Sequence, residues 1–362
     1  MRRCPASFFA RCRRFGLVAL GLIAVVATPS AATAQRSWID VHMHIVGGPR
    51  GDFAGAAATA LELMDQAGTA VAVAMPTPQA GGSDRPAPYD YDRFVDVLRR
   101  SPGRFAFAGG GGTLNPMIHQ HLNASDVTPE LRRAFEQKAE EIAAAGAAGF
   151  GEMSALHLSL QPNHAFESVQ ADHPLFLLLS DIAVRHHMII DLHMDAVVGT
   201  MRLPESLEGT GNPPTLADNV AGLERLLAHN RGASIVWAHG GSDMLGNLTP
   251  ALIRRLMQAH PNLYMSLRPV LPQADRLNKI LVSPVEIDKD WRALLVDFAD
   301  RFVMGTDSFM VSPLMTRGPP VAFARGNQAR QRAVRLLLAA LPEEVSRKIG
   351  TENARRLYRI AP

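Results

Sequence analysis

Cysteine is almost absent from this chain: of its 362 residues only two, Cys4 and Cys12, are cysteines. Both lie within the first 34 residues, so a chain that has lost this segment carries neither a disulfide nor a thiolate. Any metal site in the remaining chain must therefore use histidine, aspartate and glutamate. Apolar residues make up 47% of the sequence and charged residues 20%, which is ordinary globular composition.

A hydrophobic run long enough to cross a membrane is also missing. The apolar stretch at 15–28 is shorter than the roughly 20 residues that a bilayer span needs. Five arginines precede it and an A-x-A pattern ends at Ala34, which is typical of a secretory signal peptide cleaved before Gln35. We therefore expect a signal peptide at 1–34 and a periplasmic or secreted mature chain without membrane contact. The arginine pair at 13–14 leaves twin-arginine export open.

Positive charge is not in excess once this leader is set aside. The leader holds five of the 37 basic residues and none of the 34 acidic ones, so residues 35–362 carry 32 basic and 34 acidic residues, a net charge near −2. This balance gives no support for nucleic-acid binding. We expect a small-molecule substrate as the partner, and the sequence leaves open whether the chain forms a homo-oligomer.

Short apolar runs alternate with helical patterns through residues 35–362, which is typical of repeated βα units and a parallel sheet. Eight runs are expected to be strands: 37–45, 69–76, 104–110, 147–154, 187–195, 233–241, 262–269 and 301–308. Helices are expected at 56–66, 90–100, 129–145, 174–186, 215–229, 249–259, 288–300, 325–341 and 343–357. No G-x-G-x-x-G lies between a strand and a helix, which disfavours an open doubly wound sheet. The sequence predicts an α/β fold, a single (β/α)8 TIM barrel with C-terminal helices.

Polar side chains end several of the expected strands, where a TIM barrel carries its catalytic groups. They are Asp40, His42, His44, Glu152, His193, Asp195, His239, Arg268 and Asp307. Ile235 and Trp237 share the alternation phase of His239. Val303 likewise shares the phase of Asp307. We expect each polar end residue to continue an inward-facing row of its strand.

Barrel closure would gather imidazoles and carboxylates around one point. His42 and His44 are two residues apart on one strand, so they share a face with Cα atoms about 6.5 Å apart. His193, His239 and Asp307 come from three other strand ends. Nitrogen and oxygen donors of this kind suit Zn²⁺ or another divalent metal, with positions left open for water.

Such an ion would lower the pKa of bound water toward about 7 and polarise a carbonyl oxygen. Asp307 could take the proton of that water and deliver it to the leaving group. His239 could stabilise an oxyanion as a hydrogen-bond donor. Arg268 could hold a substrate carboxylate or form a structural ion pair, and Asp40 is expected to orient an imidazole.

Four motifs at strand ends resemble those of a known family: "DVHMH" after the first strand, "DLH" after the fifth, "WAHGG" after the sixth and "GTD" after the eighth. The closing "TENARRLYRI" is similar to the helix that ends many of its members. From about Ile39 to Ile360 the chain resembles the amidohydrolase superfamily, in its amidohydrolase-related (amidohydrolase 2) branch. The resemblance implies a metal-dependent TIM-barrel enzyme.

The resemblance also implies roles for single residues. His42, His44 and His193 would bind metal, and Asp307 would be both ligand and proton shuttle. His239 would bind a second metal or polarise the substrate carbonyl. Many binuclear relatives carry a carboxylated lysine after the fourth strand, where this chain has Glu152. That carboxylate could bridge two ions, anchor one or only form hydrogen bonds, so one or two ions remain open.

These residues lead us to expect a hydrolase that uses metal-activated water on an amide, ester or lactone of a small molecule. The alternative is a metal-dependent, non-oxidative decarboxylase of an aromatic or unsaturated carboxylic acid, because both reactions fit the same ligands. An exported binding protein without chemistry would have little need of the proton shuttle at Asp307.

Overall fold

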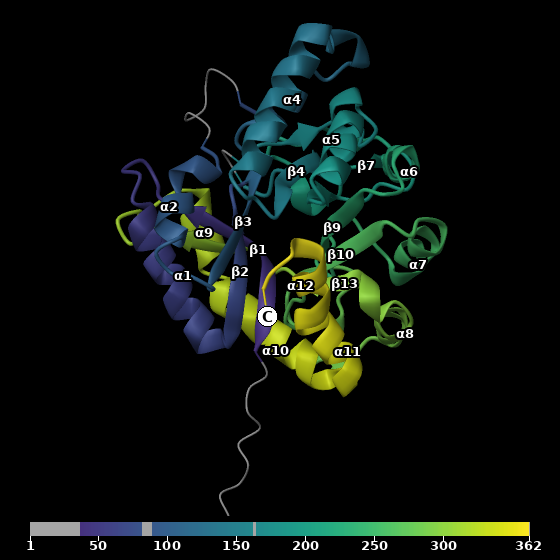
Figure 1. Cartoon of the computed structure of the whole chain (residues 1–362). Helices are drawn as coiled ribbons and strands as arrows, with labels where there is room; N and C mark the ends of the chain where they lie inside the picture. The colour runs from purple at the N-terminus through teal and green to yellow at the C-terminus, as the bar shows by residue number, and fades with distance from the viewer. Residues whose placement is uncertain (1–36, 82–88, 162–163, 362) are drawn as a thin grey trace, which may run out of the picture. The chain divides into compact units, whose positions relative to one another are not determined.

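The computed structural model describes residues 37–81, 89–161 and 164–361, and the signal peptide predicted at 1–34 lies outside them. Eight strands form one parallel sheet that closes on itself, because the last strand pairs with the first. In ring order they are β1 (Trp38–Val46), β2 (Thr69–Met75), β3 (Phe105–Gly110), β4 (Gly149–His157), β6 (Ile189–Met194), β9 (Ser234–Gly240), β10 (Leu263–Leu267) and β13 (Phe302–Met304). The predicted TIM barrel is confirmed, and each of its eight strands overlaps one of the expected runs (Figure 1).

Helices follow the strands along the chain. They are α1 (Phe53–Ala67), α2 (Val95–Leu98), α3 (Leu114–His119), α4 (Pro129–Ala144), α5 (Pro174–Arg185), α6 (Val220–His229), α7 (Pro250–Ala259), α8 (Lys289–Asp297), α9 (Pro319–Ala324), α10 (Asn327–Ala340), α11 (Glu343–Arg347) and α12 (Asn353–Tyr358). The helix expected at 90–100 is instead a 3₁₀ turn followed by the short α2, because Phe94 leaves the helical conformation with φ −129°. Among the described residues, no helix is both long and apolar enough to cross a bilayer.

Two apolar clusters form the core. The larger contains the buried side chains of the helices and the strand residues that face them, such as Trp237 and Phe302. The smaller consists of strand residues of the opposite phase, including Ile39, Val236 and Val303, and it fills the barrel. The barrel is therefore a packed core, and only its ends can carry a site.

The inward row that we expected on β9 is wrong. Ile235 and Trp237 pack in the outer cluster, whereas Val236 packs inside the barrel. The register between β9 and β10 shifts after Trp237, and His239 has a left-handed backbone with φ 72°. Because of this irregularity, the side chain of His239 faces the interior, although strict alternation from Val236 would point it outward. On the last strand Val303 does face inward, as expected.

The C-terminal helices close the amino-terminal end of the barrel. Leu357 and Tyr358 of α12 join the inner cluster, α12 contacts β13, and the π-helical turn at Lys348–Glu352 contacts both β1 and β13 (Figure 1). Buried Asn353 donates to the carbonyls of Ala299 and Phe302, at 2.7 and 2.8 Å. With this end sealed, the carboxyl ends of the strands are left for the site.

Short strands lie in the loops that follow β4, β6, β10 and β13. They are β5 (Glu167–Ser168), β7 (Met201–Arg202), β8 (Thr215–Leu216), β11 (Leu281–Ser283), β12 (Glu286–Ile287) and β14 (Ser308–Val311). β14 pairs with β1 directly beyond the point where β13 pairs with it. Asp307 therefore lies in the tight turn between β13 and β14, with φ 53°, and not within one continuous strand as expected.

Candidate metal centre

Six of the predicted site residues meet at the carboxyl ends of the strands: His42, His44, Glu152, His193, His239 and Asp307. Their donor atoms fall into two groups that share His42. One group joins it to Glu152 and His239, and the other joins it to His44 and Asp307, each with donor atoms within 4.8 Å of one another. Either group could hold a cation.

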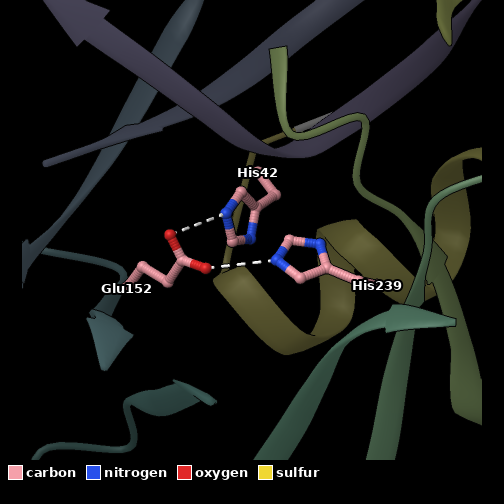
Figure 2. Close-up of side chains that lie close together, drawn as sticks. All are labelled: His42, Glu152 and His239. Carbon is pink, nitrogen blue, oxygen red and sulfur yellow. Dashed lines mark hydrogen bonds and ion pairs between the residues drawn. The ribbon is translucent and has the colours of Figure 1, made fainter. Parts of the chain in front are cut away.

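Glu152 lies at the centre of the cluster. Its Oε1 is 2.7 Å from Nδ1 of His193 and 3.1 Å from Nε2 of His239. Its Oε2 is 3.5 Å from Nε2 of His42 and 3.3 Å from Nε2 of His44. Figure 2 shows this carboxylate reaching from β4 between the imidazoles of β1 and β9. One carboxylate therefore contacts all four histidines.

The partners of Nδ1 in the two β1 histidines fix the tautomer of each ring and therefore the role of its Nε2. Nδ1 of His44 lies 3.3 Å from the carbonyl of Met75, which can only accept, so this Nδ1 carries a proton. Nδ1 of His42 lies 3.2 Å from the carboxylate of Asp191, which fixes the same tautomer. In the neutral rings both Nε2 atoms are then lone-pair acceptors, and they face each other at 3.3 Å.

Carboxylate oxygens of Glu152 and Asp307 converge on the same two nitrogens, at 3.2 to 3.5 Å. When both rings are neutral, four buried acceptors therefore meet without a matching donor, an arrangement that a cation satisfies. The donor set of imidazole nitrogens and carboxylate oxygens suits Zn²⁺ or another divalent ion. The residues present therefore fit the metal that the sequence predicts.

Without a metal ion, protons on the histidines supply the positive charge of the cluster. Burial opposes charge on His42, yet Asp191 and Glu152 raise its pKa well above the usual value. Burial would raise the pKa of Glu152, but His42 and His193 hold it well below its usual range. Burial lowers the pKa of His239 to about 3, so this ring is neutral. The cluster attracts positive charge to its centre.

Asp307 is held by an ion pair. Its Oδ1 lies 3.2 Å from Nε2 of His44, and its Oδ2 lies 3.0 Å from Nη2 of Arg268. Although burial would raise the pKa of Asp307, Arg268 and His44 hold it well below the usual value, so it is ionised at neutral pH. Arg268 also donates to Oγ of Ser242 at 2.9 Å. Of the two roles left open for Arg268, the structure shows the ion pair.

Asp40 does not orient an imidazole, contrary to our expectation. Its carboxylate accepts hydrogen bonds from the backbone N–H and the hydroxyl of Thr306, at 2.9 and 2.5 Å, and from the backbone N–H of His42. The register of β1 on β2 shifts between Asp40 and Met43, which separates the phase of Asp40 from that of His42. The carboxylate at Nδ1 of His42 is that of Asp191, which the sequence analysis missed.

A cavity of about 680 Å³ opens over the cluster. Glu152, His193, His239 and Asp307 form its floor, and its apolar lining residues are Leu158, Leu160, Met244, Phe309, Pro319, Pro320 and Phe323. A series of aromatic rings lines it, with neighbouring centroids 4.5 to 5.3 Å apart: Phe309, Phe323, His164, His157 and His193. The cavity is large enough for a small molecule.

Comparison with known proteins supports this assignment. The amidohydrolase family model matches residues 39–360. This chain belongs to the amidohydrolase family. Amidohydrolases typically bind divalent metal, in agreement with the donor cluster found at the strand ends. Among curated proteins, none matches the chain.

Solved structures with a similar fold are distant. A zinc-bound amidohydrolase from Burkholderia multivorans is 14% identical, with 90% of this chain and 100% of that chain covered and a TM-score of 0.45. 2,6-Dihydroxybenzoate decarboxylase from Rhizobium is 15% identical, with 90% of this chain and 98% of that chain covered and a TM-score of 0.41. β-Aspartyl dipeptidase from Fervidobacterium islandicum is 14% identical, with 88% of this chain and 72% of that chain covered and a TM-score of 0.45. Likeness at this level says nothing of the reaction that this amidohydrolase performs.

Proposed function

We propose that this amidohydrolase is a metal-dependent hydrolase that uses metal-activated water on an amide, ester or lactone bond of a small molecule. The observation that carries the proposal is the convergence of two imidazole lone pairs and two carboxylates at the floor of the cavity. His42, His44, His193, Glu152 and Asp307 are the proposed ligands. Zn²⁺ is the proposed metal, with one or two ions.

Each residue has a part in the proposed reaction. A bound divalent ion would supply a lowered pKa for water and polarisation of the substrate carbonyl. Asp307, ionised and fixed by Arg268, accepts the proton of the attacking water and passes it to the leaving group. His239 lies at the cavity floor, 3.0 Å from Nδ1 of His193, where it can contact the substrate carbonyl oxygen.

A second candidate is non-oxidative decarboxylation of an aromatic or unsaturated carboxylic acid. The observation that favours it is the series of rings along the cavity wall, including Phe309 and Phe323, which offers stacking faces to a flat substrate. The two reactions differ in product. Release of acid from an ester, lactone or amide panel supports the hydrolase, and release of CO₂ from an aromatic acid panel supports the decarboxylase.

Metal content per chain, measured by elemental analysis of the purified protein, tests the metal centre on which both reactions depend. We expect one or two divalent ions in the wild type and a lower content in Glu152→Gln, because this variant loses the charge that contacts all four histidines. Glu62→Gln, an exposed change on α1, is the matched control and should keep the wild-type content. A wild type that cannot be loaded with metal would refute the proposal.

Export is proposed on the sequence alone. The A-x-A pattern ending at Ala34 supports cleavage before Gln35 and a periplasmic or secreted enzyme. The contact of His239 with the substrate is likewise a proposal.

A further inference from the structure

The loop that follows β10 carries a second arginine to the cavity. Arg276 lines the cavity together with Arg268, Asp307 and Met244. Arg268 is already committed, since its two terminal nitrogens bind Asp307 and Ser242. The only hydrogen bond that the side chain of Arg276 makes within the described residues is from Nη1 to the backbone carbonyl of Asp275, at 2.5 Å. No carboxylate among the described residues forms an ion pair with it.

The acidic groups that line the cavity form no ion pair with Arg276, and each of them has another partner. They are Glu152 with His193 and His239, Asp195 with His193, Glu167 with Asn115 and Ser154, and Asp307 with Arg268. Burial, and then repulsion by Arg268, lower the pKa of Arg276, and the attraction of Asp275, Asp195 and Asp307 offsets them only in part. The guanidinium thus lies in a partly buried position with a like charge nearby and no ion-pair partner among the described residues.

The backbone around Arg276 is fixed. The N–H of Leu277 donates to the carbonyl of Asp243 at 2.9 Å, and the side chain of Asn278 donates to the Asp243 carboxylate at 2.6 Å. The carbonyl of Asn278 in turn accepts from the indole of Trp291 at 2.9 Å. A guanidinium on a braced loop can bind an anion without first losing the freedom of the loop.

We propose that Arg276 is the anion anchor of this cavity, and that the substrate carries a carboxylate that pairs with it, apart from the group that reacts over the donor cluster. The planar guanidinium offers parallel N–H donors that match a carboxylate. The apolar lining residues then contact the body of the substrate. This inference rests on the proposed function only in taking the cavity as the substrate pocket. It assigns a specificity role to Arg276 that differs from the structural role of Arg268.

The test compares benzoate with benzamide, which have the same ring but differ in charge. Isothermal titration calorimetry is run on the metal-loaded wild type, Arg276→Gln, Arg276→Lys and Arg231→Gln. We expect the wild type to bind benzoate roughly tenfold or more tightly than benzamide. Arg276→Gln should lose this preference without a change for benzamide, and Arg276→Lys should keep part of it. Arg231, exposed on the loop before β9, is the matched control.

The same titrations on chelator-treated protein separate this inference from the proposed function. A preference that survives chelation and disappears in Arg276→Gln supports the anchor, whatever the metal content proves to be. A preference that disappears with the metal and is unchanged in Arg276→Gln would mean that benzoate binds the metal, and would overturn the proposal. Equal affinity for the two compounds in the wild type, or no binding of benzoate, would also overturn it.

Discussion

At the scale of single residues, the candidate metal centre depends on groups that contact its histidines but would not contact the cation. Asp191 and the carbonyl of Met75 occupy the outer nitrogens of His42 and His44, so the inner nitrogens are free to bind a cation. Asp191 is fully buried on β6, and its carboxylate lies 3.2 Å from the His42 ring. A carboxylate behind a ligating imidazole fixes its tautomer and raises its basicity.

Asp191→Asn should therefore weaken metal binding without removing a ligand. We expect the affinity for Zn²⁺ to fall about 10- to 100-fold, the usual effect of losing such a partner. Competition with a chromophoric chelator at fixed pH measures it. Asp290→Asn, an exposed change on α8, is the control. If the two variants bind Zn²⁺ equally well, Asp191 does not position His42.

The sequence predicted the residues that meet at the centre but not all of those that support them. His42, His44 and Asp307 could be predicted because a barrel brings its strand ends together, whatever lies between them. The sequence has D-x-H twice, at Asp40 to His42 and at Asp191 to His193, and neighbourhood in the chain favoured Asp40 as the partner of His42. The actual contact crosses the barrel over 149 positions, which no local pattern reveals.

At the scale of elements, irregularities at the ends of the strands orient the side chains of the site. The register shift in β1 and the left-handed residues His239 and Asp307 all lie where a strand reaches the site. Strict alternation, the basis of our expectation for β9, holds in the body of each strand and fails at these ends. Sequence patterns report the regular alternation, whereas bulges depend on the neighbouring strand.

Gly305, between β13 and Asp307, shows how closely the elements approach at the site. A Cβ at this position would lie 2.9 Å from Cβ of His42 and 3.0 Å from Cβ of Ser266. Neither atom can move without its backbone. Gly305→Ala should therefore displace His42, with a cost of about 1–3 kcal/mol in the free energy of unfolding and a loss of metal affinity.

Urea unfolding and Zn²⁺ competition measure the two effects. The matched control is Gly199→Ala, because a Cβ there would meet nothing within 4 Å. If Gly305→Ala has the stability and metal affinity of the wild type, the strand end accommodates the added Cβ without displacing His42, and the prediction is wrong.

At the scale of the whole molecule, one end of the barrel is sealed by α12 and the other carries the site. This division could be predicted, because eight βα units and a closing helical region are long, periodic signals. The walls of the cavity could not be predicted, because they include loops and the two-residue strand β5, which is too short to show a period. Arg276 belongs to such a loop. Its lack of an ion-pair partner among the described residues is a property of the folded chain only.

The proposed metal should also stabilise the barrel as a whole. Its ligands come from β1, β4, β6 and the turn after β13, so unfolding of the barrel separates them. A ligand that binds only the folded state adds about 4 kcal/mol when its free concentration is 1,000 times Kd. We expect removal of the metal with a chelator to lower Tm by roughly 5–15 °C, as measured by differential scanning calorimetry.

His44→Ala separates this effect from direct action of the chelator on the protein. The variant loses one ligand from the middle of the cluster, so its Tm should already be low and should hardly change when the chelator is added. Re-addition of Zn²⁺ should restore the wild type and not the variant. An unchanged wild-type Tm after elemental analysis has shown that the metal is gone would mean that the strand ends hold their arrangement without it. The cluster would then contribute to catalysis alone and not to the stability of the fold.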